Sequence, residues 1–315
     1  MIDLHLHLDG SMRPSTVREL LAEEGVNIWK DDKEAEDALC VPPGCNSLNE
    51  YLTRFDYPCR VLKKASNITR AVYELAEDIY HQGITYAEIR FAPLLSYNEK
   101  LSIDEAVYAA IEGAVKAEKE FSGLKIGLIL CCMRGDWHEE NMRTVDAAHK
   151  YIGDHVCALD LAGAEGLYPT EEYEDVFHKA RKLDIPFTIH AGEAAGPESI
   201  WHALEFGAVR IGHGVRCIED ATLVDYLARH EIPIEVCPTS NMQTKVFGSI
   251  DEYPLKELLM NGVCATLNTD NMTVSRTTIL KERDFAVEKL GLTEDDITAM
   301  EQNSRKAAFL MKNQK

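Results

Sequence analysis

Two histidines near the start of the chain have the spacing of a metal site. His5 and His7 lie in the segment Asp3-Leu-His-Leu-His-Leu-Asp9, in which leucines alternate with polar residues. In a β-strand such alternation places all polar side chains on one face, so the two imidazoles are neighbours. Paired imidazoles on an otherwise apolar strand predict a bound metal ion.

Four further candidates end or closely follow short apolar runs later in the chain. They are His190, Glu193, His213 and Asp270. If these runs are strands of an α/β barrel, their C-terminal ends meet at one mouth, where the first two histidines also lie. Three imidazoles and a carboxylate suit Zn²⁺, with Fe²⁺ or Mn²⁺ as alternatives. A metal with an open coordination position activates water and a neighbouring carboxyl group transfers protons, so the set predicts metal-assisted hydrolysis.

Eight apolar runs predict the strands that position these residues. They span residues 2–8, 84–91, 125–133, 156–162, 186–190, 209–212, 232–237 and 264–270. The later runs are spaced for a strand, a helix and a return, and capping boxes at Ser102–Glu105 and Thr293–Asp296 predict helix starts. We expect an α/β fold, a (β/α)₈ TIM barrel. The alternative is an open doubly wound sheet, but no G-x-G-x-x-G motif follows the first run.

The segment 11–83 holds too much chain for one helix. Leu48, Tyr51, Leu52 and Phe55 recur in it at helical spacing, after the loop sequence Pro-Pro-Gly. We expect extra helices inserted after the first strand, either as a lid over the barrel mouth or as helices that pack on its side. The whole chain, 1–315, is then a single domain.

The charge and the cysteines restrict the partners and the compartment. The 33 Lys and Arg against 53 Asp and Glu give a net charge of −20, which disfavours nucleic acid and anionic membranes as partners. The nine cysteines form no C-x-x-C pair and several lie in apolar runs, as expected of reduced thiols. With no basic leader and no apolar run near 20 residues, the expected location is the cytoplasm.

Taken together, the motifs resemble those of the adenosine deaminase family, within the metal-dependent amidohydrolase superfamily. In order, the matching segments are HLHLDGS (5–11), YAEIRFAP (86–93), CCMR (131–134), LDLAGAE (159–165), HAGEAAG (190–196), IGHG (211–214), CPTSN (237–241) and LNTD (267–270). The resemblance implies zinc-dependent hydrolytic deamination of adenosine, and of 2′-deoxyadenosine, to inosine and ammonia in purine salvage. The expected partner is a small purine nucleoside, and the protein is expected to be a monomer or a weak homo-oligomer.

The same resemblance implies a role for each site residue. One Zn²⁺ per chain would be held by His5, His7, His190 and Asp270. Glu193 would protonate N1 of the purine, while His213 and Asp270 would hold the attacking hydroxide and take its proton.

Substrate contacts are also implied by the resemblance. The Gly163 amide would donate to N3, and Asp9 would bind a ribose hydroxyl. His7 would also contact the substrate, and Leu52 and Phe55 would form the apolar lid. Many family members have a second acid after the zinc-binding aspartate, whereas this chain has Asn271. An amide always carries N–H donors, so Asn271 can donate a hydrogen bond to purine N7. Which purine the protein prefers is not determined by this residue.

Several other functions compete with this one. A related deaminase acting on adenine or on a modified adenosine would share the site, as would another mononuclear metal hydrolase of the superfamily. A basic cluster for a monophosphate is not evident in residues 11–70, which disfavours AMP. A non-catalytic binding protein is expected to lack part of the metal and acid set, and the zinc deaminase signature H-x-E with P-C-x-x-C is matched only at His138.

Overall fold

The eight predicted strands form a closed barrel in a computed structural model that describes residues 1–311. In chain order they are β1 (Ile2–His7), β2 (Tyr86–Phe91), β3 (Lys125–Met133), β4 (Val156–Ala162), β5 (Thr188–Ala191), β6 (Arg210–His213), β7 (Ile234–Val236) and β8 (Ala265–Leu267). Neighbouring strands pair in parallel as two four-stranded sheets, β1-β2-β3-β4 and β5-β6-β7-β8. Bridges Leu6–Asp270 and Leu159–Phe187 join the two sheets at both seams, so the predicted (β/α)₈ barrel is confirmed.

Two strands, β6 and β8, end at residues other than the predicted ones, at the points where the chain passes from the sheet into the site. β8 stops at Leu267, three residues before the predicted end at Asp270, whereas β6 runs one residue further and ends at His213. Both site residues have left-handed backbones, with φ of 62° for Asp270 and 56° for His213. This conformation is uncommon outside glycine and is typical of active sites, where the surrounding structure holds it in place.

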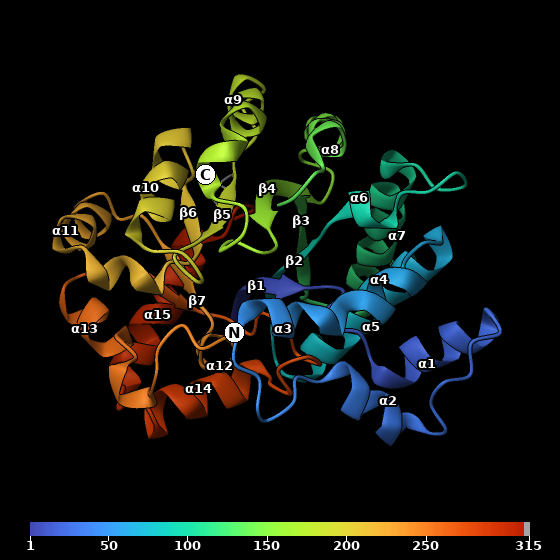
Figure 1. Ribbon diagram of the computed structural model, residues 1–315, viewed down its shortest axis with the longest axis horizontal. Coiled ribbons are helices and arrows are strands. Elements are labelled where there is room, and N and C mark those ends of the chain that lie inside the picture. The colour runs from blue at the N-terminus through green and yellow to red at the C-terminus, as the bar shows by residue number, and fades with distance from the viewer. Residues whose placement is uncertain (312–315) are drawn as a thin grey trace.

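Helices cover the outside of the barrel (Figure 1). They are α5 (Ala65–His81), α6 (Pro93–Ser96), α7 (Ile103–Glu120), α8 (His138–Tyr151), α9 (Glu174–Lys182), α10 (Pro197–Phe206), α11 (Ala221–Arg229), α12 (Pro238–Gln243), α13 (Leu255–Met260), α14 (Ile279–Glu288) and α15 (Glu294–Ala307), with four short 3₁₀ turns elsewhere, one of them in the insertion. Capping boxes at Ser102 and Thr293 begin α7 and α15, as predicted. No helix within residues 1–311 combines the length and the apolar character that crossing a bilayer would require.

The chain between β1 and α5 forms the inserted helices. These are α1 (Pro14–Glu23), α2 (Asp32–Leu39), α3 (Leu48–Leu52) and α4 (Asp56–Val61), while α5 is the barrel helix that leads to β2. The insertion is attached to the loop after β8: the Val41 amide donates to the Val274 carbonyl over 2.9 Å, and the Tyr51 and Ser275 hydroxyls lie 2.6 Å apart. The helix predicted from the apolar spacing is therefore α3, continued by a 3₁₀ turn at Thr53–Phe55.

Charged side chains fill part of the barrel interior. Arg90 on β2 forms ion pairs with Asp160 on β4 at 2.9 Å and with Glu235 on β7 at 2.8 Å. Arg210 on β6 pairs with the same Glu235 at 2.7 Å and with Glu88 at 2.6 Å, and all five side chains are fully buried. Buried charges persist only when they are paired and hydrogen-bonded, so this network fixes the acids beneath the barrel mouth.

Candidate active site

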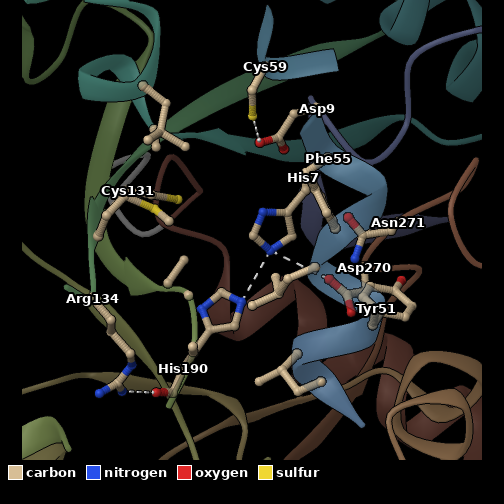
Figure 2. Close-up of a pocket in the computed structure, with 18 of the residues that line it drawn as sticks. His7, Asp9, Tyr51, Phe55, Cys59, Cys131, Arg134, His190, Asp270 and Asn271 are labelled. Atoms are coloured by element: carbon tan, nitrogen blue, oxygen red, sulfur yellow. Dashed lines mark hydrogen bonds and ion pairs between the residues drawn. The ribbon is translucent and has the colours of Figure 1, made fainter. Parts of the chain in front are cut away.

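The predicted site residues converge on one cavity at the C-terminal ends of the strands. The cavity has a volume of about 380 Å³ and contains in its lining His7, Asp9, Leu52, Phe55, Gly163, His190, Glu193, His213, Asp270 and Asn271. His5 lies behind them and is fully buried. Figure 2 shows the His7 and His190 rings pointing toward each other across the floor of the cavity, with Asp270 beside them. The residues singled out in the sequence thus lie in or directly behind one cavity.

Four of these residues have the geometry of a metal site. Ligand atoms of His5, His190, His213 and Asp270 all lie within 4.8 Å of one another. His7 joins them, because its Nε2 atom is 3.1 Å from Nε2 of His190 and 3.5 Å from Oδ1 of Asp270. Nε2 of His5 is buried and has no hydrogen-bond partner in the described structure, as expected of a nitrogen that binds a metal.

Two buried carboxylates orient these imidazoles from behind. Nδ1 of His5 is 2.8 Å from Oε2 of Glu235, and Nδ1 of His190 is 2.9 Å from Oδ2 of Asp160. Burial alone raises the pKa of Asp160, but the neighbouring His190 and Arg90 charges outweigh burial and hold that pKa below its usual range. Sequence reasoning missed both acids, although each is an isolated acid inside an apolar run, which is a usable signal.

His213 has a different partner behind it. The Tyr253 hydroxyl donates to Oδ1 of Asn241 over 2.8 Å, which turns the Asn241 amide nitrogen toward Nδ1 of His213 at 3.0 Å. Nδ1 then accepts, so the ring hydrogen is on Nε2, 3.5 Å from Oε2 of Glu193. Burial lowers the pKa of His213 well below its usual value, which favours the neutral ring. Asn241, which the sequence analysis gave no role, thus contacts a residue of the site.

Glu193 is a buried acid at the edge of the metal cluster. Only 5 % of its surface is exposed, and burial, followed by the nearby Asp270 charge, raises its pKa well above the usual value. The Thr244 hydroxyl lies 3.2 Å from its Oε1 atom. A carboxyl group that stays protonated at neutral pH is suited to donate a proton to a substrate.

Asn271 is packed against the backbone of Gly10. A Cβ atom at position 10 would lie 1.7 Å from Oδ1 of Asn271, so only glycine leaves room for this amide. Asn271 is buried, lines the cavity, and its Oδ1 atom has no hydrogen-bond partner in residues 1–311. The glycine that follows Asp9 therefore sets the position of a polar group in the binding cavity.

The remaining polar side chains of the cavity are acidic or already engaged. Asp9 is 3.6 Å from the Cys59 thiol of the insertion, and burial raises the pKa of Asp9 to about 6 (Figure 2). Asp56 lines the same wall. Arg134, the cation in the lining, donates to the carbonyls of Tyr168 and His190 and to the Thr170 hydroxyl. The two terminal nitrogens of Arg134 are thus used within the protein.

The remaining predicted contacts frame the cavity. Gly163 follows β4 with a φ of +109°, a conformation that favours glycine, and forms part of the wall. Leu52 and Phe55 are half-buried and also line the cavity, from α3 and the turn that follows it. The insertion therefore covers the mouth with apolar side chains, which is the arrangement expected of a lid.

Comparisons with known proteins show the family to which the chain belongs. The family model described as Adenosine deaminase matches residues 1–315. An adenosine deaminase of Haemophilus ducreyi is 45% identical over 320 residues, which cover 100% of this chain and 93% of that protein. The solved N6-methyl-AMP deaminase of Arabidopsis thaliana is 28% identical with a TM-score of 0.82, over 98% of this chain and 91% of that one. The adenine deaminase of Arthrobacter aurescens shares the fold, with a TM-score of 0.88 at 23% identity over 98% of this chain and 93% of that one. Because the family model and the Haemophilus ducreyi relative both span the full sequence, the chain belongs to the adenosine deaminase family.

Proposed function

We propose that this protein hydrolyses the C6 amino group of adenosine, and of 2′-deoxyadenosine, to give inosine or deoxyinosine and ammonia, as a step of purine salvage. The observation that carries the proposal is a buried acid, Glu193, beside a cluster of imidazoles and Asp270 in one nucleoside-sized cavity. The full-length relatives named adenosine deaminase support the same substrate.

One Zn²⁺ per chain fits the donor set. Three imidazoles and a carboxylate without thiolate are typical of zinc, and the unpartnered Nε2 atom of His5 needs a partner of this kind. When bound, the metal supplies Lewis-acid activation of a water molecule.

The hydrogen-bond partner of each Nδ1 atom distinguishes the histidines that can bind the metal from the one that donates a hydrogen bond. In His5 and His190, Nδ1–H donates to a carboxylate, which leaves the Nε2 lone pair free for a metal. In His213 the hydrogen is on Nε2, so this ring donates rather than ligates. We therefore assign His5, His7, His190 and Asp270 as the ligands, and His213 as the group that orients the attacking water.

Proton transfer is assigned to two acids. Glu193 donates to N1 of the purine, which makes C6 electrophilic, and Asp270 accepts the proton that the attacking water loses. Asp270 then passes this proton to the departing amino group, which leaves as ammonia, while the hydroxyl proton on C6 returns to Glu193 and C6 becomes the carbonyl of inosine. Burial and the Asp270 charge raise the pKa of Glu193, which favours its protonated, proton-donating form.

Substrate binding uses the rest of the lining. The Gly163 amide is assigned to N3, the Asn271 amide to N7, and Asp9 with His7 to the ribose, while Leu52 and Phe55 close over the ligand. We also propose that residues 1–315 act as one domain with 11–83 as its helical insertion and lid. A cytoplasmic location and a monomeric or weakly oligomeric state stay predictions.

Replacing Glu193 tests the proposal. Zinc-loaded wild-type protein should convert adenosine with a fall in absorbance and release of ammonia, and Glu193→Gln should lose about 10² to 10⁴-fold in kcat. Its zinc content should stay at one per chain. Glu198→Gln changes an exposed acid in the first turn of α10, just after the Glu193 loop, and should behave as wild type. Loss of zinc in Glu193→Gln, or its full activity, would show that Glu193 is not the acid. Absence of adenosine turnover by the wild type would remove the proposed function.

A further inference from the structure

The loop that carries Glu193 is wrapped around a second buried carboxylate. Oε2 of Glu165 accepts hydrogen bonds from the amides of Glu193, Ala194 and Ala195 over 3.0, 2.7 and 2.9 Å. Its Oε1 atom accepts from the Gly192 amide over 2.8 Å and from the Ser199 hydroxyl over 2.5 Å. Five donors therefore converge on one side chain, of which only 2 % is exposed.

Four consecutive backbone amides form a concave cradle of the kind that binds anions. Gly192 makes the bend possible, with a φ of +71° and a position where a Cβ atom would lie 2.4 Å from Ile200. Turned inward in this way, the four amides have no other acceptor within residues 1–311, and a buried amide without an acceptor is costly. The loop conformation and the Glu165 carboxylate consequently require each other.

The other end of the same loop is also held by a charge. Arg134 donates to the carbonyl of His190, as Figure 2 shows, and to the Thr170 hydroxyl, which lies 2.7 Å from Ser199. Ser199 in turn donates to Glu165. Arg134 and Glu165 thus clamp the segment from His190 to Ala195 at both ends, through one connected set of hydrogen bonds.

We propose that Glu165 is a positioning residue for the reaction: its carboxylate fixes the 192–195 backbone so that the Glu193 side chain projects into the cavity beside His213. Glu165 is absent from the cavity lining, so it acts on the substrate through Glu193 and not by contact. The inference rests on the proposed function in one respect: it takes Glu193 to be the acid that protonates the substrate. The hydrogen-bonded cradle itself does not depend on which substrate is bound.

Glu165→Gln is the direct test, because it keeps the shape of the side chain but replaces one acceptor oxygen by an NH₂ group that faces amide donors. Glu198→Gln is the matched control: Glu198 is an exposed acid next to the same loop whose carboxylate accepts one amide bond, from Gly196 over 3.2 Å. Ser199→Ala is a milder second variant that removes a single donor and leaves the carboxylate in place.

Three measurements are made on zinc-loaded proteins: zinc content, kcat and KM for adenosine, and deuterium exchange of the 192–195 amides without substrate. Glu165→Gln should keep zinc, lose roughly 100-fold in kcat with KM changed by less than about threefold, and exchange these four amides faster, because a small misplacement of a reacting group costs about that much. Ser199→Ala should lower kcat by about threefold to tenfold with KM unchanged, as expected for one hydrogen bond.

Wild-type kcat in Glu165→Gln, or unchanged exchange of the four amides, would overturn the proposal. A fall in kcat that merely parallels a loss of bound zinc would also overturn the proposal. If Glu165→Gln does not fold, Ser199→Ala decides, and an unchanged kcat in that variant overturns it. Because the exchange measurement needs no turnover, it tests the cradle even if adenosine proves not to be the substrate.

Discussion

Nδ1 of His5 lies 2.8 Å from Oε2 of Glu235, and neither side chain is exposed to solvent. The carboxylate fixes the imidazole with Nε2 facing the cavity, and Arg90 holds the carboxylate in turn. Residues of this kind set how tightly a metal is bound although they do not touch it.

Glu235→Gln should therefore weaken zinc binding by roughly 10- to 100-fold, because the amide orients His5 less strongly and raises the basicity of the ring less than a carboxylate. Competition with a chromophoric chelator measures the affinity. Glu257→Gln, an exposed acid on α13, is the control and should bind zinc as the wild type does. Equal affinities for all three proteins would show that the His5–Glu235 contact has no role in metal binding.

Gly10→Ala should displace Asn271, because the added methyl group would overlap with its Oδ1 atom. We expect a loss of about 1–3 kcal/mol in the free energy of unfolding, as for other overpacked sites, and a lower kcat/KM for adenosine. In Gly44→Ala the methyl group meets no atom within 4 Å, so this variant should match the wild type in both measurements. An unperturbed Gly10→Ala enzyme would mean that Asn271 does not contact the purine.

Adenosine should be preferred over AMP by about 100-fold in kcat/KM. A phosphate within about 6 Å of Asp9 would be repelled by roughly 3 kcal/mol at an effective dielectric constant near 20. Asp56 lies on the same wall, and Arg134 is already engaged. Asp56→Asn should reduce the preference for adenosine over AMP. Equal kcat/KM values for the two substrates in the wild type would contradict this electrostatic explanation. The comparison is informative because a solved relative is named as an N6-methyl-AMP deaminase.

Glu282, on α14 away from the cavity, should make stability pH-dependent. Burial raises its pKa from 4.5 to about 7 in the folded protein, so the folded state binds the proton more tightly than the unfolded chain. Stability should then fall as pH rises from about 4.5 to about 7, by up to roughly 3 kcal/mol, since each pKa unit corresponds to about 1.4 kcal/mol. Urea unfolding at pH 5, 6 and 8 measures this, and Glu282→Gln should flatten the dependence. Glu288→Gln, exposed on the same helix, should leave it unchanged; identical curves for Glu282→Gln and the wild type would refute the assignment.

The sequence predicts the barrel and the inward-facing groups because both follow from local patterns. Alternating Leu and His in β1 places the imidazoles on one face, and the Ser102 capping box begins a helix, whatever the rest of the chain does. The hydrogen-bond partners of these groups could not be predicted in the same way. Asp160 on β4 contacts His190 on the adjacent β5, and Glu235 on β7 contacts His5 on β1, two strands further around the barrel. These contacts depend on strand tilt and register, which no local pattern encodes. Glu165 was visible in a motif, but its five donors come from another loop and from α10.

The seam between β1 and the chain after β8 has a consequence for folding. The Asp270 amide donates to the His5 carbonyl and the His7 amide donates to the Asp270 carbonyl, so proposed metal ligands also close the ring of strands. A neighbouring bond joins Leu4 to Asn268, 264 positions away along the chain. Contacts of such high sequence separation carry a large loop-closure entropy, so we expect this seam to close late. A nascent chain on the ribosome that already exposes His5 and His7 still lacks Asp270, so complete metal coordination marks a finished barrel.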